Sequence, residues 1–146
     1  MAIAGLAVGL VSASMAETAG DVIRVDVVGL RNADGDIKCA LFTNADGFPT
    51  DSSKALKTTS AQIQNGSAEC DFDHVWPAEY GVSVYHDENS NGKLERNFMG
   101  IPKEGVGASN DAAGTFGPPK FDDARFTYSG GTKVITVHIR YLTAPF

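Results

Sequence analysis

The sequence of 146 residues contains no cluster of lysine and arginine, and this absence restricts the partners to be considered. Its formal net charge is −6, with 12 basic residues against 18 acidic residues. An acidic chain without a basic cluster is a poor candidate for binding nucleic acid or an anionic membrane. The same excess of carboxylates suits a divalent cation better.

The motifs that mark many enzyme sites are also missing. The sequence has no Gly-x-Ser-x-Gly elbow, no phosphate-cradling glycine loop and no HExxH pair. His86, Asp87 and Ser90 are close in sequence and suggest a small hydrolase. Neighbours on a strand point to opposite faces, however, so His86 and Asp87 are badly placed to act on one substrate. No second histidine or cysteine stands at ligand spacing from His86, which argues against a transition metal. We predict that the protein is not an enzyme.

Long apolar runs are scarce. Residues 1–16, "MAIAGLAVGLVSASMA", carry no charged side chain and end in small residues, a pattern typical of a secretory signal peptide, although the basic start is missing. The run is too short to span a bilayer stably, and no second run follows. We therefore expect residues 17–146 to form one exported domain, periplasmic or extracellular, with no stable membrane span.

Alternation of apolar and polar residues is frequent and predicts β-strands. Turn-forming residues separate the alternating segments, and Asp34-Gly35 is a strong hairpin signal. Residues 52–63 fit either one short helix or an irregular crossover into a strand. Several short strands with at most one helix predict an all-β fold, an antiparallel β-sandwich. The strands expected are residues 22–30, 36–42, 69–76, 79–88, 124–128 and 133–141.

The alternation also predicts which side chains face the interior. Cys39 and Cys70 both point inward on separate strands, and in an exported protein such a pair favours a disulfide over two buried thiols. No CxxC motif is present, so nothing indicates a redox role. His74 and Trp76 are expected to face inward, with Trp76 closing one end of the sandwich or, alternatively, stacking on a sugar. His138 is expected on the surface.

Tyr80 stands directly before the strand "GVSVY". This is where a tyrosine corner closes an immunoglobulin-like sandwich, because the tyrosine hydroxyl bonds to the backbone a few residues upstream. The alternative is an ordinary aromatic residue at the start of a strand.

From Asn89 to about Asp123 the chain is rich in glycine, asparagine, aspartate and proline, and no regular structure can be assigned. Loops of this length in a compact domain are usually functional or disordered. The segment carries four large apolar residues, too many for a solvated linker. We therefore expect it to be ordered on the sandwich surface. These residues are Phe98, Ile101, Phe116 and Phe121.

The stretch "HDENSNGKLERN" raises the question of a calcium loop. An EF-hand-type loop takes oxygen ligands from its first, third, fifth, seventh and ninth positions, with glycine at the sixth and a glutamate at the twelfth. Gly92 occupies the sixth position here, whereas Phe98 at the twelfth cannot ligate. The five ligand positions are Asp87, Asn89, Asn91, Lys93 through its carbonyl, and Glu95.

The missing twelfth ligand leaves two interpretations open. In the first, a carboxylate from the following segment folds back to complete a calcium site; the candidates are Glu104, Asp111, Asp122 and Asp123. In the second, the stretch is only a turn, because aspartate and asparagine bond to their own backbone and Asn91-Gly92 reverses the chain without a metal.

Several stretches together resemble a bacterial family of small exported proteins, domain of unknown function 2141 (DUF2141). They are "CALFTNADGFP", "ECDFDHV", "VYHDENSNGKL", "GIPKEGVGAS" and "FGPPKFDDARF". The resemblance covers most of the chain after residue 16. It implies an immunoglobulin- or transthyretin-like β-sandwich and an exported location. It implies no activity.

These observations predict an exported β-sandwich with one long irregular loop region, acting as a binding or structural module that holds one calcium ion in residues 87–95. The alternative is a metal-free, envelope-associated domain whose long loop docks an unidentified protein partner. A small hydrolase with an unrecognised site is the third interpretation.

Overall fold

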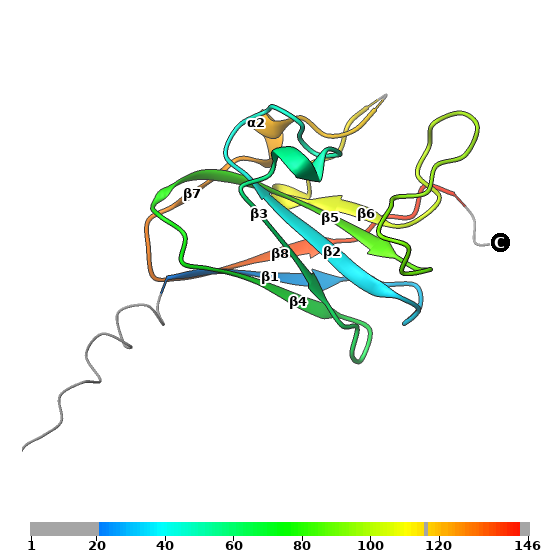
Figure 1. Cartoon of the computed structure of the whole chain (residues 1–146), viewed down its shortest axis with the longest axis horizontal. Coiled ribbons are helices and arrows are strands. Elements are labelled where there is room, and N and C mark those ends of the chain that lie inside the picture. Colours follow the sequence, from blue (N-terminus) through cyan, green and yellow to red (C-terminus); the bar gives the residue numbers. More distant parts are fainter. Residues whose placement is uncertain (1–20, 116, 144–146) are drawn as a thin grey trace, which may run out of the picture.

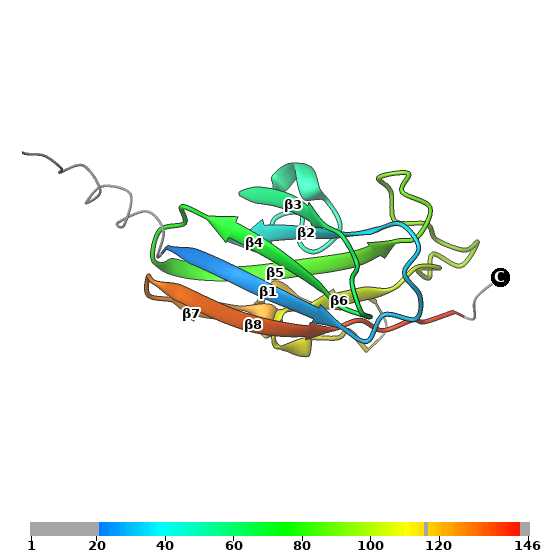
Figure 2. The same ribbon diagram turned by 90° about the horizontal axis from the view of Figure 1, so that it is seen from below.

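The computed structural model describes residues 21–115 and 117–143, and its strands form two packed layers (Figures 1 and 2). The expected leader, residues 1–16, lies outside the described residues. One layer has the strand order β4-β1-β8, and the other has the order β3-β2-β5-β6, with β7 also paired to β5. The strands are β1 Val22–Val28, β2 Asp36–Phe42, β3 Lys57–Ala61, β4 Ala68–Asp73, β5 Ala78–Asp87, β6 Val106–Ala108, β7 Phe126–Tyr128 and β8 Thr132–His138, and the short helices are η1 Ser52–Lys54, η2 Ser109–Asp111 and α2 Phe121–Ala124.

The predicted all-β sandwich is confirmed, with one departure in strand direction. β1 pairs with β4 in antiparallel register, but it pairs with β8 in parallel. β5 is the longest strand and lies at the centre of the second layer. β2 pairs along most of one edge of β5, while the short strands β6 and β7 pair with different parts of it. Residues 52–63, left open by the sequence, form η1 followed by β3.

The main core fills the space between the two layers. Alternate residues of β1 and β2 are fully buried there, as the two-residue period of a strand requires. A second, smaller cluster lies on the outer face of β2, where Phe42, Phe48 and Phe121 stack edge to face with ring centroids 5.2 and 5.6 Å apart. Gly81 of β5 permits this contact, because a Cβ atom there would lie 2.9 Å from the Phe121 ring.

A disulfide joins the two layers. Cys39 on β2 and Cys70 on β4 are bonded, their Cα atoms are 6.6 Å apart, and both side chains are buried. This distance is within the range of ordinary disulfides. The predicted pairing is confirmed.

The prediction that His74 and Trp76 face inward is wrong. β4 ends at Asp73, and His74 has a φ of +58°, so the backbone turns and the alternation is lost. Val75 takes the buried position instead, and Trp76 is 83% exposed. The Tyr80 hydroxyl donates to the Trp76 carbonyl oxygen at 2.6 Å, which is the bond expected of a tyrosine corner.

Parts of the long segment after β5 pack against the sandwich, and other parts of it are exposed. It contains β6, η2 and α2, and Ser109 is buried where its hydroxyl accepts from the Val82 N–H and donates to the Ala124 carbonyl. Phe121 is buried and Ile101 is half-buried, as expected. Phe98, in contrast, is 97% exposed. Phe116 lies outside the described residues.

Candidate functional site

The candidate site is the loop that follows β5. Asp87 ends that strand and is fully buried, and its two carboxylate oxygens accept from the backbone N–H groups of Asn91 at 3.2 Å and Gly92 at 2.8 Å. Ser90 and Gly92 have φ values of +54° and +76°, which let the chain turn back over the carboxylate. Asp87 thus fixes the path of the loop from inside.

The other predicted ligands lie on the same loop. The Asn89 and Asn91 side-chain oxygens accept from the backbone N–H groups of Asn91 and Lys93 at 3.3 and 3.0 Å. Their amide nitrogens both donate to Oε1 of Glu95. These hydrogen bonds, from Asn89 first and then Asn91, lower the pKa of Glu95. The structure therefore brings Asp87, Asn89, Asn91, Lys93 and Glu95 together, and holds them through turn-type hydrogen bonds.

Glu104 folds back onto this loop from further along the chain. It is 3% exposed, and its carboxylate accepts from the Glu88 N–H at 2.8 Å and from the Glu95 N–H at 3.1 Å. It therefore bonds to the loop near both of its ends. Asp111 does not reach the loop and bonds instead to His138, and Asp122 lies beside Arg125. Asp123 belongs to α2.

Several carboxylates lie close to one another in this region. Burial raises the pKa of Tyr85 to about 12, and the charges of Asp87, Glu104 and Asp36 act in the same direction. Asp36 faces Asp87 across the β2–β5 pair, and one of its oxygens accepts from the Lys38 ammonium at 3.0 Å. The other, Oδ1, is buried and has no hydrogen-bond partner within the part of the chain described.

Arg31 joins three segments around the loop. Its guanidinium forms two bonds with the Glu88 carboxylate, Nε to Oε2 at 3.1 Å and Nη2 to Oε1 at 2.6 Å. The same guanidinium donates to the carbonyl oxygens of Lys103 and Thr143 and lies 4.3 Å from the centre of the Tyr141 ring. We call this arrangement the Arg31 clasp. It connects the β1–β2 loop to the candidate site and to the chain after β8.

His86 is fully buried, and both of its ring nitrogens form hydrogen bonds within the fold. Nδ1 lies 2.8 Å from the Tyr141 hydroxyl, and Nε2 lies 2.6 Å from the Asp34 carbonyl oxygen. The Asp34 carbonyl can only accept, so Nε2 donates to it, and with the ring proton on Nε2 the Nδ1 atom accepts from the Tyr141 hydroxyl. The same hydroxyl accepts from the Arg31 backbone N–H. His86 and Asp87 thus have separate hydrogen-bond partners: His86 bonds to Tyr141 and Asp34, and Asp87 bonds to the backbone of Asn91 and Gly92.

Within residues 21–115 and 117–143, no group of three or more histidine, cysteine, aspartate or glutamate side chains is placed to hold a metal ion. A cation at the candidate site would need the asparagine amide oxygens and the Lys93 carbonyl in addition to the carboxylates. Calcium accepts such a mixed oxygen set, whereas zinc takes nitrogen and sulfur ligands as well as oxygen.

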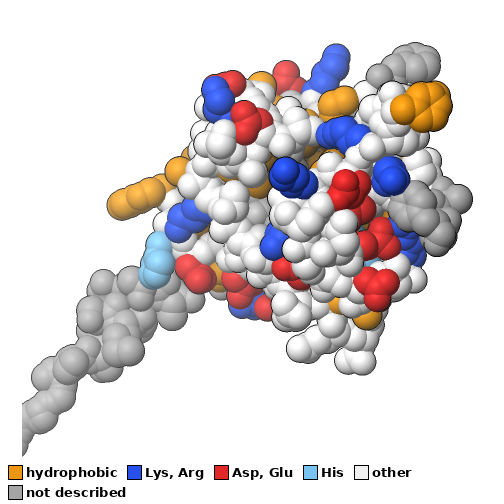
Figure 3. All heavy atoms as spheres, turned by 45° about the vertical axis from the view of Figure 1, so that its right-hand side comes forward, with side chains coloured by type: hydrophobic (Ala, Val, Ile, Leu, Met, Phe, Trp, Pro, Cys, Tyr) orange, Lys and Arg blue, Asp and Glu red, His pale blue; other side chains and the backbone are white. Residues whose placement is uncertain are grey.

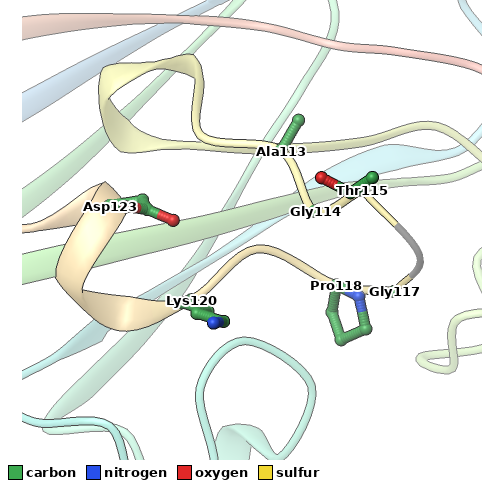
Figure 4. Close-up of a pocket in the computed structure, with 7 residues that line it drawn as sticks. All are labelled: Ala113, Gly114, Thr115, Gly117, Pro118, Lys120 and Asp123. Atoms are coloured by element: carbon green, nitrogen blue, oxygen red, sulfur yellow. The ribbon is translucent and has the colours of Figure 1, made fainter.

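Two hollows lie elsewhere on the surface. The first is surrounded by the loop before α2, and Figure 4 shows its seven lining residues. Most of them are small, and Lys120 and Asp123 supply its charged groups. The second lies between β1, β4 and the chain after β3, and Asp26 and Glu69 contribute its charged side chains. Neither hollow contains a residue of the candidate loop.

A comparison of the sequence with protein-family models identifies the family of this chain. The model described as "Uncharacterized protein conserved in bacteria (DUF2141)" matches residues 25–136. The chain belongs to this family. The match runs from β1 into β8 and includes the whole candidate loop, so the loop is part of the DUF2141 domain. It confirms the resemblance seen in the sequence motifs.

The other comparisons add no relative of this DUF2141 protein. No curated protein and no solved structure matches the chain. Among the described residues, none of the helices has the length and apolar character needed to cross a membrane.

Proposed function

We propose that this protein is an exported β-sandwich module whose loop, residues 87–104, binds one calcium ion with low affinity. The observation that carries the proposal is the position of Glu104. The linear motif lacks an acidic residue at its twelfth position, and Glu104 brings a buried carboxylate to the same loop from outside the motif. The proposal assigns no catalytic step to the module.

The oxygen donors on the loop fit calcium in number and kind. Asp87, Glu95 and Glu104 offer carboxylates, and a carboxylate has about four lone-pair positions. Asp87 uses two of them for backbone N–H groups and retains capacity for a cation. Turning the amide groups of Asn89 and Asn91 would present oxygen in place of the nitrogens that now bond to Glu95. These add to the Lys93 carbonyl to give the six or more oxygens that calcium prefers.

Electrostatics favours a cation at the same place. Buried carboxylates destabilise a fold unless they are hydrogen-bonded or paired with positive charge. Asp87 and Glu104 are both buried, and their charges, together with that of Asp36, act on Tyr85. Two of the proposed ligands are neutral amides, however, so the affinity should resemble that of extracellular modules, with a dissociation constant of about 10⁻⁴–10⁻³ M.

The disulfide supports the exported location. Disulfides between buried cysteines persist in oxidising compartments and are rare in the cytosol. The Cys39–Cys70 bond therefore agrees with the signal peptide expected in residues 1–16 and with a periplasmic or extracellular protein.

The test is thermal unfolding of the purified protein in excess chelator, in about 2 mM calcium and in about 2 mM magnesium. With a dissociation constant of about 0.1 mM, about 2 mM calcium adds about 1.8 kcal/mol of stability by mass action. For a domain of this size the melting temperature should rise by on the order of 4–6 °C. Calcium should raise it more than magnesium does, because magnesium demands stricter octahedral geometry.

Two variants locate the ion, and a third serves as a control. Asp87→Asn and Glu104→Gln each remove one negative charge from the site and should greatly reduce the calcium response. Asp46→Asn removes an exposed carboxylate from another turn and should respond as the wild type does. A response in Asp87→Asn equal to that of the wild type would place the ion elsewhere. A wild-type shift below about 1 °C would leave the loop as a turn and favour the metal-free, envelope-associated interaction domain.

A further inference from the structure

Residues 95–103 form a narrow projection that we call the finger. Lys103 N–H donates to the Glu95 carbonyl at 2.8 Å, and Arg96 forms an isolated bridge with Pro102. The tip carries Phe98, 97% exposed, and Met99, 63% exposed. In Figure 3, which brings the loop end of the molecule forward, hydrophobic side chains stand out from the surface, and lysine and arginine side chains lie on the same face.

Several backbone groups at the tip of the finger form hydrogen bonds within the finger and do not depend on water for them. The Asn97 side-chain oxygen accepts from the N–H groups of Met99 at 2.9 Å and Ile101 at 3.0 Å. Asn97 N–H donates to the Ile101 carbonyl and Gly100 N–H to the Asn97 carbonyl, both at 2.9 Å. The Arg96 guanidinium donates to the Gly100 carbonyl at 3.0 Å. Four backbone N–H groups at the tip therefore have internal partners, which lowers the cost of moving the tip into a medium of lower polarity.

The charge on the finger and its base differs in sign from that of the whole chain. Residues 93–103 carry Lys93, Arg96 and Lys103 against one acidic residue, Glu95. The total charge of −6 disfavours an anionic surface at long range. At about 0.1 M salt, however, charges more than about 10 Å apart are largely screened. The carboxylates of Asp87 and Glu104 at the base of the finger are buried, whereas Lys93 and Arg96 are exposed. A nearby surface therefore meets the basic side chains first.

We propose that the finger docks on lipid, inserting Phe98 and Met99 into the headgroup region of a bilayer that contains anionic phospholipid. An apolar tip beside basic side chains is the arrangement that binds reversibly at such an interface. Arg96, whose guanidinium donates to the Gly100 carbonyl at the tip, is the basic group offered to the phosphates. The docking does not rest on calcium and is tested both with calcium and with chelator.

The single tryptophan makes the orientation measurable. Trp76 precedes the start of β5 and the finger follows its end, so the two lie at opposite ends of a strand of ten residues, about 33 Å long. A bilayer that touches the finger should leave Trp76 in water. The native emission therefore reports on the wrong end of the molecule. A tryptophan placed at position 98, by Phe98→Trp in a Trp76→Phe background, reports on the finger.

The experiment measures binding of the full chain to phosphatidylglycerol–phosphatidylcholine vesicles and to pure phosphatidylcholine vesicles. We expect the protein to bind to the anionic vesicles. Phe98→Ser should lower the partition coefficient onto these vesicles at least tenfold, and Arg96→Gln should lower it about fivefold. Phe98 is exposed, so its replacement should not disturb folding. Leu56→Ser removes another exposed apolar side chain, outside the finger, and should change partition less than twofold. Tryptophan emission should shift to shorter wavelength for the probe at position 98, and not for Trp76.

Four results would overturn the proposal. The first is no vesicle binding in either calcium or chelator. The second is binding that survives Phe98→Ser, and the third is a vesicle-induced shift of Trp76 emission. The fourth is a concentration-dependent dimer that Phe98→Ser abolishes while vesicles remain unbound, which would make the finger a contact between two copies of the chain.

Discussion

The Arg31 clasp predicts that the candidate loop depends on one partly buried ion pair. Arg31 and Glu88 share two hydrogen bonds, and their side chains are only 16% and 18% exposed. Burial alone would raise the pKa of Glu88, but the hydrogen bonds from Arg31 and Asn32 outweigh it and hold that pKa below its ordinary value of 4.5. The same pairing raises the pKa of Arg31. The lowered pKa of Glu88 and the raised pKa of Arg31 both mean that each charged group stabilises the other.

The expected magnitude follows from these contacts. A hydrogen bond to a charged group contributes about 1.5–3 kcal/mol, and partial exposure reduces that amount. We expect a coupling free energy of about 1–3 kcal/mol between Arg31 and Glu88 at pH 7. Arg31→Met should destabilise the fold by about 2–4 kcal/mol, because it also removes the bonds to the Lys103 and Thr143 carbonyls and the contact with the Tyr141 ring.

The lowered pKa of Glu88 also predicts how the stabilisation by this ion pair changes with pH. The folded pKa of Glu88 is lowered, so the pair stabilises the fold fully above the ordinary pKa of 4.5, and the contribution is lost as the pH falls through the lower folded value. The assay is a double-mutant cycle of Arg31→Met and Glu88→Gln, measured by urea unfolding from pH 7 down to the lowest pH at which the proteins fold. The coupling should decrease steadily over the acid end of that range.

A second ion pair in the same protein provides the control. Arg24 and Asp71 bond at 2.9 Å, but their side chains are 36% and 34% exposed. Exposed pairs typically contribute about 0.2–1 kcal/mol, so a cycle on Arg24 and Asp71 should give the smaller coupling. A coupling below about 0.5 kcal/mol for Arg31 and Glu88 at pH 7 would refute the reasoning. So would a coupling that does not change as Glu88 becomes protonated.

Two further predictions concern buried links. Replacing both Cys39 and Cys70 by alanine removes a bond that closes 31 residues, and urea unfolding should show a loss of about 3–4 kcal/mol by the chain-entropy model; a loss below about 1 kcal/mol would contradict it. Ser109→Ala leaves the buried Val82 N–H and Ala124 carbonyl without their partner and should cost about 2–4 kcal/mol in the same assay. An unchanged free energy of unfolding would mean that the backbone finds other partners there.

Strand positions could be predicted because the pattern of a half-buried strand is local. Residues 36–42 form β2 as expected, since the side chains on its inner face must be apolar at every second position. The pairing of Cys39 with Cys70 followed from the same parity. The pattern failed at His74, where a left-handed backbone conformation ends β4. Nothing in the alternation of apolar and polar residues indicates that change, so the prediction that Trp76 faces inward was wrong as well.

The candidate loop was predictable only in its first half. The spacing of Asp87, Asn89, Asn91 and Gly92 is written in the sequence, and these residues do form one turn. Four carboxylates were candidates to complete the set, and spacing could not choose between them. Glu104 reaches the loop because β6 pairs with β5 directly after it and returns the chain alongside Asp87. Asp111, in contrast, lies further along the chain and forms a hydrogen bond with His138.

The sequence by itself therefore determined the family, the strands, the inward cysteines and the turn chemistry after β5, because each depends on residue types a few positions apart. The tertiary structure alone decided the rest, namely the parallel pairing of β1 with β8, the return of Glu104 and the clasp through Arg31. It also decided that Trp76 and Phe98 stand in solvent at opposite ends of the sandwich. These features join residues far apart in the chain, and their contacts exist only once the two sheets have packed.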